Sequence, residues 1–466
     1  MNRNNIVIIL AATLALGLVS CSSARYASPE ADTDGLFRNE NPTDTATIAD
    51  ISWNEYFTDP YLRDMIDEGI RNNFDLAIAY TRIQQAEENL RMAKSAFFPT
   101  VALAGQAEHR QFSKGPDNVL GGHADQFTLG IASTWEVELW GKLSSRKRSQ
   151  YAQVLNSHAY RNLIQTSLVA NIATSYYALM ALDEQLKVTK NNVAIMEETA
   201  QAMQDMFDAG LQARAAVRQS LGVLYNAKAT IPDLEARIWQ TENAICTMLG
   251  RKPGPIGRSE IGRQSLPAQM DHGVPVQLLS RRPDVQQAEL AFRSAFELTT
   301  MAKRSFYPSL TLGTGSLFAF SSTTLSQFFK PENLFANILG GLTQPLFSQR
   351  QLKGNLAIAK AQQEAALLTF EKTVLAAGQE VSNIIYSYRA SRGKNDVRTR
   401  QVESLRGAVE DTDELYKSGE SNYLEVLTAQ QGLLSAQLSQ VNDKLEQLQY
   451  TVTLYKALGG GYDRGE

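Results

Sequence analysis

Side chains that commonly catalyse reactions or bind metal ions are few and scattered in this sequence. The chain has four histidines, and none of them stands in a spacing that metal sites use. They are His109, His123, His158 and His272. The sequence also lacks a Gly-x-Ser-x-Gly motif and a phosphate-binding glycine loop. It therefore predicts no enzyme, no metal site and no bound cofactor.

One residue near the N-terminus does have a recognisable chemistry, which is covalent lipid attachment. Residues 1–20 begin with a positive charge at Arg3 and continue with an apolar run that is too short for a permanent membrane helix, a pattern typical of a secretory signal peptide. The run ends in Leu-Val-Ser-Cys, which resembles the bacterial lipobox. We therefore expect acylation of Cys21 and a lipidated linker over 21–52. An ordinary signal peptide with an incidental cysteine is the alternative.

Composition narrows the possible partners. The formal net charge of -4 and a pI near 5.8 show no basic bias, which argues against nucleic acid as a partner. After acylation of Cys21, only Cys246 remains, so no intrachain disulfide can form. No second apolar stretch reaches roughly 18 residues, so further membrane contact must come from β-strands. By resemblance to the sorting rules of enteric bacteria, Ser22 favours the outer membrane as the destination.

The chain contains the same unit twice. A shift of about 209 residues superimposes five separated landmarks, which a single offset rarely does by chance. The landmarks are Met92-Ala93-Lys94 with Met301-Ala302-Lys303, Asp75 with Asp284, Tyr177 with Tyr386, Gly210 with Gly419, and Leu249-Gly250 with Leu458-Gly459. We therefore predict two structural repeats, over 53–260 and 261–466.

Each repeat contains one very long helical stretch and a shorter return helix. Proline is absent between Pro116 and Pro232 and again after Pro345, so the long helices can run without interruption. The long helices are expected over about 141–208 and 349–417, and the return helices over about 212–250 and 421–458. At about 1.5 Å per residue each long helix would reach roughly 100 Å, a length at which coiled-coil packing is expected. Pro232 should bend or split the first return helix.

Four segments alternate between apolar and polar residues with a period of two, as strands with one apolar face do. They are expected over about 100–114, 125–139, 309–321 and 334–347. These lengths equal or exceed the roughly 9 to 11 residues that a tilted membrane strand needs. Aromatic residues near the strand ends suit a membrane interface or, alternatively, packing at the foot of the sheet. They are Phe97, Phe98, Trp135, Trp140, Phe306, Tyr307 and Phe347.

A protomer with four strands cannot close a membrane barrel by itself. An open edge in hydrocarbon would leave peptide groups unpaired, at several kcal/mol each. Two copies would give a barrel with a filled lumen, whereas three copies leave room for a passage. We therefore predict a mixed α and β membrane protein, and a function as a duct would favour three copies with a 12-stranded transmembrane β-barrel. The alternative of a different class is a lipid-anchored periplasmic coiled-coil scaffold without a pore.

Recognisable motifs follow one another along nearly the whole expected mature chain. They are Asp59-Pro60 with Leu62, Asn73-Phe74-Asp75-Leu76, Ala96-Phe97-Phe98-Pro99, Trp135-Glu136 with Glu138-Leu139-Trp140-Gly141-Lys142, Ile231-Pro232, Arg281-Arg282-Pro283-Asp284, and Tyr455-Lys456-Ala457-Leu458-Gly459. Their order and spacing resemble the TolC-like outer-membrane factor family, in particular its lipidated NodT or OprM group.

The resemblance implies a homotrimeric 12-stranded transmembrane β-barrel that continues into a long α-helical coiled-coil tunnel. It implies a passive exit duct that is anchored in the outer membrane by its lipid and extends into the periplasm. It also implies three kinds of protein partner: two further copies of the chain, a periplasmic adaptor protein and an inner-membrane RND-type transporter. Together they would form a tripartite efflux pump for drugs, metals or other small molecules. The exit duct of a protein or polysaccharide secretion system is the alternative.

The far ends of the long helices contain the candidate gate. The repeat places two short acidic and apolar segments opposite each other, just before the glycines of the two turns. In a trimer they would form rings; apolar rings can close a pore by dewetting, and acidic rings favour cations. The predicted gate residues are Asp205, Met206, Phe207, Glu414, Leu415 and Tyr416, with Asp411 and Asp413 as neighbours. The alternative is that these side chains only solvate and pack the tips.

The two turns that follow are expected to be exposed helix ends. Gly210 and Gly419 would supply the left-handed residue that ends each long helix. By resemblance to the family, the turns contact the adaptor protein. The predicted contact residues are Gly210, Leu211, Gly419, Glu420 and Ser421.

Overall fold

The computed structural model describes residues 26–30, 36, 51–111, 123–264 and 276–462. Cys21, the expected signal peptide and most of the expected linker lie outside these residues. The chain divides into two compact units, which are described separately below. Unit 1 contains Met1–Glu30, Ala96–Ser149 and Phe292–Glu364. Unit 2 contains Ala31–Ser95, Gln150–Ala291 and Ala365–Glu466.

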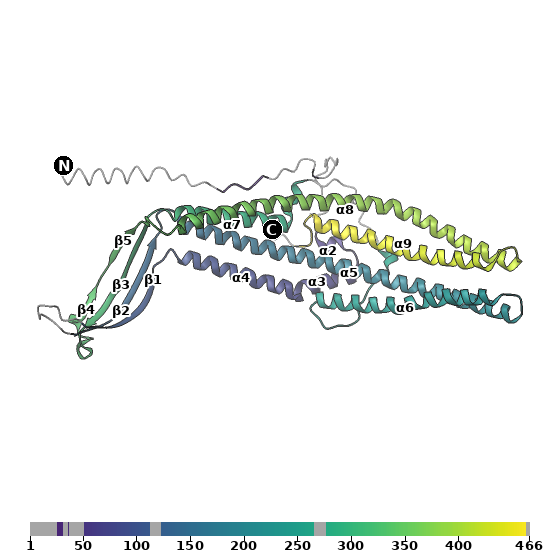
Figure 1. The fold of residues 1–466 in the computed structure, drawn as a ribbon, viewed down its shortest axis with the longest axis horizontal. Coiled ribbons are helices and arrows are strands. Elements are labelled where there is room, and N and C mark those ends of the chain that lie inside the picture. Colours follow the sequence, from purple (N-terminus) through teal and green to yellow (C-terminus); the bar gives the residue numbers. More distant parts are fainter. Residues whose placement is uncertain (1–25, 31–35, 37–50, 112–122, 265–275, 463–466) are drawn as a thin grey trace. The chain divides into compact units, whose positions relative to one another are not determined.

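Unit 1 contains an antiparallel sheet in which strands adjacent in sequence are adjacent in space (Figure 1). β1 pairs with β2, β2 pairs with β3, and β3 pairs with both β4 and β5. The strands are β1 (Thr100–Gln111), β2 (His123–Val137), β3 (Ser309–Ser322), β4 (Leu334–Ala336) and β5 (Leu339–Thr343). The two short strands share one edge of the sheet, so the sheet has four strand positions.

The register of the sheet aligns apolar side chains in rows across the strands. Leu103 lies opposite Ile131, and Ile131 lies opposite Phe318. In the neighbouring row, Phe320 lies opposite both Leu129 and, on the other side, Leu334. Because the side chains of a strand alternate between its two faces, such rows form one continuous apolar face.

The fourth strand differs from the sequence prediction of a single strand over about 334–347. It is interrupted after Ala336 and ends at Thr343. The physical reason lies in β3, where the pairing shifts: β2 advances from Ile131 to Ser133 while β3 moves from Phe318 to Thr314. β3 thus contains an irregularity of the β-bulge type, and the strand beside it must break to stay paired on both sides.

Unit 2 is built mainly from two helical hairpins, α5 with α6 and α8 with α9 (Figure 1). Their bounds are α5 (Lys142–Asp208), α6 (Arg214–Met248), α8 (Gln351–Ser418) and α9 (Tyr423–Ala457), and the first residues of α5 and α6 each precede those of α8 and α9 by 209 residues. The lengths of 67 and 68 residues make α5 and α8 roughly 100 Å long. None of the described helices combines the length and apolar character needed to cross a bilayer.

The sequence predicts that Pro232 bends or splits the first return helix. In the structure Pro232 does not split it. α6 continues through it from Arg214 to Met248. Proline removes only one backbone donor, and the remaining helical hydrogen bonds together with packing of the apolar face hold the helix on both sides.

A hydrophobic core joins the bases of the hairpins in unit 2. Its fully buried side chains include Leu62 and Ile66 from α3, Ile172 and Tyr176 from α5, and Leu458 after α9. Smaller elements complete the two units. They are α2 (Trp53–Tyr56), α3 (Pro60–Asn72), α4 (Phe74–Ser95), α7 (Pro283–Arg304), and the 3-10 turns Ile261–Arg263, Val276–Arg281, Leu325–Gln327 and Pro331–Asn333.

Candidate functional site

Both long helices end in the same backbone motif. Gly210 has φ +76° and Gly419 has φ +81°, the left-handed region that glycine adopts without strain. The N–H of Gly210 donates to the carbonyl of Phe207, and the next N–H donates to the carbonyl of Met206. The second hairpin repeats this pair of bonds at Gly419. This is the Schellman arrangement, so the left-handed caps predicted from the sequence are confirmed.

A compact apolar cluster lies next to these turns and joins the two hairpins. Its buried members come from α5, α6 and α9. They are Met203, Val217, Tyr423, Val426 and Leu427. Burial of side chains of this size stabilises a site by roughly 1.5–3 kcal/mol each. The cluster, called the tip cluster below, therefore fixes the ends of the two hairpins against each other.

Tyr416 on α8 connects the tip cluster to the first turn. Its hydroxyl donates to the sulfur of Met206, with 3.1 Å between the two atoms, and accepts a bond from Nε2 of Gln212 at 3.1 Å. Its ring lies 5.7 Å from that of Tyr423, centroid to centroid. The two hydrogen bonds thus hold the end of α8 against α5 and the turn that follows it, and the ring contact joins the end of α8 to the start of α9.

Three of the predicted gate residues are therefore packing residues of the tip cluster. Met206, Phe207 and Tyr416 are half-buried and contact the cluster. The guanidinium carbon of Arg214 lies 5.3 Å from the centroid of the Phe207 ring, a cation–π distance. The structure brings these three side chains together within one protomer.

The remaining predicted gate residues stay at the surface. Leu415 is 41% exposed, and Glu414 and Asp411 are also exposed. Asp205 accepts a hydrogen bond from Gln201 on its own helix, at 2.8 Å. In the described part of the chain, no hydrogen bond or ion pair joins Asp205 to Glu414. Exposed carboxylates beside an exposed leucine form a surface that is available to water or to other chains.

Asp413 differs from the other predicted carboxylates because it has a cation beside it. It pairs with Lys417 one helical turn later, at 2.6 Å. The Asp413 carboxylate raises the pKa of the Lys417 ammonium through a hydrogen bond and through its charge. Such i,i+4 pairs on an exposed helix are screened by water and stabilise a protein little, so Asp413 contributes little to holding the tip together.

Sequence reasoning missed several residues of this site. Gln212, Arg214 and Tyr423 contact the predicted gate residues, and Asn422 caps α9 by accepting bonds from the backbone N–H groups of Leu424 and Glu425. Burial raises the pKa of Tyr423 to about 12. Asn directly before a helical apolar run is an N-cap signal that was readable in the sequence.

The aromatic residues predicted at the strand ends fall into two groups. Trp135 donates its Nε1–H to the carbonyl of Phe97 at 2.9 Å, and Trp140 donates to the carbonyl of Pro308 at 2.6 Å while stacking on Tyr307. These indoles pack at the foot of the sheet. Others remain at the surface. The exposed members are Phe98 at 72%, Phe347 at 87% and, although it stacks on Trp140, Tyr307 at 44%.

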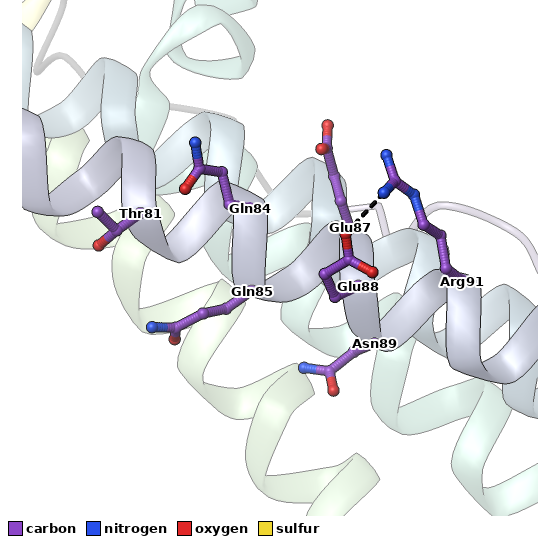
Figure 2. A pocket seen from close by; sticks show the side chains of 7 residues that line it. All are labelled: Thr81, Gln84, Gln85, Glu87, Glu88, Asn89 and Arg91. Carbon is purple, nitrogen blue, oxygen red and sulfur yellow. Dashed lines mark hydrogen bonds and ion pairs between the residues drawn. The ribbon is translucent and has the colours of Figure 1, made fainter.

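Neither the surface of α4 nor the acidic, histidine and cysteine side chains of the described residues form a ligand site. Figure 2 shows a surface depression lined by Thr81, Gln84, Gln85, Glu87, Glu88, Asn89 and Arg91. All seven come from α4, and the drawn ion pair joins Glu88 to Arg91 on that same helix. One polar helix face encloses no ligand. Within the described residues, no group of three histidine, cysteine or acidic side chains is arranged to hold a metal ion.

Comparison with known proteins reproduces the internal repeat. The model of the family described as "Outer membrane efflux protein" matches the chain twice, over residues 65–251 and 274–460, two ranges that lie 209 residues apart. The chain belongs to the outer membrane efflux protein family. The family predicted from the sequence motifs and the predicted duplication are both confirmed.

The similarity extends over nearly the whole chain. The pyoverdine export outer membrane protein OpmQ of Pseudomonas putida is 26% identical over 461 residues, which is 96% of each chain. The probable outer membrane lipoprotein SilC of Salmonella typhimurium is 24% identical over 428 residues, 92% of each chain. The solved outer-membrane channel OprN has a TM-score of 0.84 at 25% identity, covering 94% of this chain and 99% of that one.

Family membership gives the tip cluster and the sheet their functional setting. The protein is an outer-membrane channel component of an efflux pump. The predicted location in the outer membrane is confirmed. The family consists of transport proteins, combines helices with strands and carries a repeated domain, in agreement with the predicted fold class at this level.

Proposed function

We propose that three copies of this chain form the exit duct of a tripartite efflux pump. Each copy supplies four strand positions to a 12-stranded β-barrel in the outer membrane and two helical hairpins to a tunnel in the periplasm. The duct is passive. An inner-membrane transporter of the RND type supplies the energy, and a periplasmic adaptor protein connects transporter and duct.

The exposed apolar face of the sheet carries this proposal. Leu103, Phe318 and Leu334 are 76%, 54% and 52% exposed in one chain, although they lie in adjoining apolar rows. Such a face is unfavourable in water and favourable in hydrocarbon. Among the described residues, β1 pairs only with β2, and β4 and β5 pair only with β3. Neighbouring copies would pair these edges, as hydrocarbon requires.

The test is the state of the purified mature protein. We expect a detergent-requiring trimer by light scattering and stepwise channel currents in planar bilayers. A Cys21→Ser variant behind a cleavable signal peptide removes the lipid and should still require detergent, because the sheet face remains apolar. A monomer that stays soluble in water without detergent would rule out the proposed duct.

The lipid anchor is a separate proposal, supported by the lipobox-like sequence and by the name of the relative SilC. Cys21 would carry the acyl chains. Cells grown with labelled palmitate should incorporate the label into this protein, and the Cys21→Ser variant should not. Cys246→Ser is the matched control, because the thiol of Cys246 is buried and donates to the carbonyl of Gly254.

We also propose that the tips form the periplasmic gate, with two roles. Met206, Phe207 and Tyr416 hold the hairpin ends together, as their contacts in the tip cluster support. The exposed members line the constriction. They are Asp205, Asp411, Asp413, Glu414 and Leu415.

Single-channel conductance tests both roles. Replacing Glu414 and Leu415 with Ala should raise the conductance, because the smaller side chains narrow the pore less. Leu424→Ala is the matched control, since Leu424 is 53% exposed on the return helix and is not a predicted gate residue. Tyr416→Phe removes the bonds to Met206 and Gln212 and should raise the open probability. Unchanged currents in all gate variants would show that the tips merely pack and solvate.

The turns at the hairpin ends are the proposed contact with the adaptor protein. Leu211 is 75% exposed, and the whole group lies at helix ends. The proposed contact residues are Gly210, Leu211, Gly419, Glu420 and Ser421. Cysteines at Leu211 or Ser421 should crosslink to the adaptor in cells, and a cysteine at the exposed Trp239 should not.

The cargo is proposed to be set by the inner-membrane transporter rather than by this chain. Relatives are named for the export of pyoverdine, toluene and cations, which share no chemistry. A duct lined by generic polar groups can serve all of these. Drug and metal susceptibility of a deletion strain, restored by the intact gene, would identify the cargo.

A further inference from the structure

Two methionine sulfurs near the end of α5 lie beside one hydroxyl group on α8. The Oη atom of Tyr416 lies 3.1 Å from the sulfur of Met206 and 3.8 Å from the sulfur of Met203. A hydroxyl group has a single proton to donate, so it bonds to the nearer sulfur, and a thioether sulfur is a weak acceptor. The hydrogen bond between α8 and α5 at the tip therefore depends on one lone pair of the Met206 sulfur.

Of these two methionines, Met206 is the one that solvent reaches. Met203 is only 1% exposed, whereas Met206 is half-buried, and Asp205 and Asp208 beside it on the helix are exposed. Three other described methionines also have access to solvent. They are Met92, Met248 and Met301. Among these four, and within the described part of the chain, only the Met206 sulfur accepts a hydrogen bond from another side chain.

We propose that Met206 is a site of reversible oxidation to the sulfoxide, and that this modification releases Tyr416 and loosens the tip. The proposal rests on the gate of the preceding section and adds its chemical regulation. The reactant is an oxygen-transferring oxidant of the hypochlorous acid class. The sulfur loses two electrons and gains one oxygen atom, and hypochlorous acid is reduced to chloride with release of a proton.

The contacts of Met206 explain why the added oxygen weakens the tip. A thioether sulfur has two lone pairs, and the one that accepts the Tyr416 hydroxyl points at an atom only 3.1 Å away. An oxygen added there occupies the space of the hydroxyl and displaces it. An oxygen added on the other lone pair makes an apolar side chain polar beside the apolar tip cluster. Both products therefore favour movement of Met206 away from the cluster and toward water.

Loss of this bond should act in the same direction as Tyr416→Phe. A neutral hydrogen bond that is lost shifts an equilibrium by about two- to tenfold. We therefore expect oxidation of Met206 to raise the open probability of the channel by a similar factor. The reaction is reversible, because a dithiol returns two electrons through a methionine sulfoxide reductase and the oxygen leaves as water.

Mass spectrometry tests the modification independently of the channel. Outer membranes that contain the full-length protein are treated with a few equivalents of hypochlorous acid and digested with trypsin. The expected peptide spans 191–214, because no lysine or arginine lies between Lys190 and Arg214. It contains Met196, Met203 and Met206, of which the first two are 3% and 1% exposed. Fragment ions should place the added oxygen on Met206 severalfold faster than on the other two.

Single-channel recording of the purified trimer tests the effect on the tip. Hypochlorous acid should raise the open probability, and methionine sulfoxide reductases with a dithiol should return it to the starting value. Both stereospecific enzymes are needed, because the two lone pairs give two epimers. A rise that the reductases do not reverse would assign the effect to another side chain and would overturn the proposal.

Two leucine variants provide the matched comparison. Met206→Leu introduces the residue that stands 209 positions later, Leu415, so the backbone of the repeat accepts it. This variant lacks the sulfur bond; its open probability should start above that of the unaltered protein and should not respond to the oxidant. Met92 is 62% exposed on α4, away from the tip cluster. Met92→Leu should leave the full response to the oxidant in place.

The outcomes separate this proposal from the proposed function. Oxygen uptake at Met206 that is no faster than at Met196 and Met203 would overturn the modification site, while a trimer that conducts normally keeps the duct. Oxidised Met206 with unchanged open probability would overturn the coupling to the tip if Tyr416→Phe does raise that probability. If Tyr416→Phe also has no effect, the proposed role of Tyr416 in the gate fails together with this inference. A trimer that does not conduct would remove the duct itself.

Discussion

In each repeat a side chain donates a hydrogen bond to a carbonyl group at the end of the return helix, but the two donors differ chemically. In the first repeat, Nδ2 of Asn73 donates to the carbonyl of Met248 at 2.9 Å. In the second, Nη1 of Arg282 donates to the carbonyl of Ala457 at 2.9 Å. Both donors and both acceptors are 209 residues apart. A neutral amide and a cation thus satisfy the same orphan carbonyl at the end of a helix.

The arginine recruits further charges that the asparagine does not need. The side chain of Arg282 is only 10% exposed, and it binds both Asp284 and Glu380. Burial by itself raises the pKa of Asp284, but the hydrogen bonds and charge of Arg282 outweigh it and hold that pKa below its ordinary 3.8. The second repeat therefore depends on ion pairs where the first depends on neutral hydrogen bonds.

The interiors of the two hairpins show the same contrast. Leu234 in the first hairpin is 8% exposed, and its equivalent in the second is Asp443, whose side chain is 3% exposed. Lys394 and Arg398 neutralise the carboxylate of Asp443. One backbone position thus accepts a leucine or an ion cluster. The two repeats keep the same backbone at this position, but each repeat fills the interior with different side chains.

Substitutions at Leu234 and Asp443 should give the largest difference in stability between the two repeats. Leu234→Asp buries a carboxylate in a position where no cation is prepared, and should destabilise the protein by about 3–5 kcal/mol. Asp443→Leu should change stability by less than about 1 kcal/mol, since Lys394 and Arg398 can turn to solvent. Thermal midpoints by circular dichroism in detergent measure both. Equal losses would mean that the two interiors are interchangeable.

Removing the two closing side chains should have the next largest effect. Arg282→Ala leaves two carboxylates and one carbonyl without their donor and should destabilise by about 2–4 kcal/mol. Asn73→Ala loses only neutral bonds, at about 1–2 kcal/mol. Hydrogen exchange at the ends of α9 and α6 would locate the damage in each case. Arg282→Lys should restore part of the loss, because the charge returns without the planar fork.

Acid should weaken the bonds of Arg282 at the end of α9 before it weakens the bond of Asn73 at the end of α6. The pKa of Asp284 is lowered in the folded protein, so its contribution is present above the unfolded value of 3.8 and is lost as the pH falls through the lower folded pKa. The bonds of Asn73 do not titrate. Hydrogen exchange between pH 5 and pH 2 should therefore rise first at the end of α9. Simultaneous loosening of both helices would contradict this order.

The smallest expected effect concerns the turns at the tips. Asn422 caps α9, whereas its equivalent Ala213 provides no side-chain cap to α6. Asn422→Ala should lose about 0.5–2 kcal/mol, and Ala213→Asn should gain up to about 1 kcal/mol. The gain in the second variant is the informative result, because it would equalise the two hairpins. Differential scanning of both variants measures it.

Much of this protein could be read from periodic features. The absence of proline predicted the long helices, and Gly210 and Gly419 predicted the caps, because both signals act within a few residues of themselves. The sequence predicts only part of the tip cluster. The sequence predicts Tyr416 as a gate residue, but its contacts to Met206 and Gln212 span more than 200 residues of sequence and no local pattern reports them.

The sequence by itself determined the duplication, the helical and strand segments, the apolar face of the sheet and the family, because each rests on a repeated or local pattern. Only the tertiary structure decided which side chains each repeat buries and which of the buried side chains are charged. Arg350 illustrates the difference: it adopts φ +64° at the position equivalent to Gly141, although nothing local favours it. Arg350 is exposed, so burial does not account for its backbone. Which faces and charges are buried depends on packing between residues that are far apart in the sequence, and no local pattern reports it.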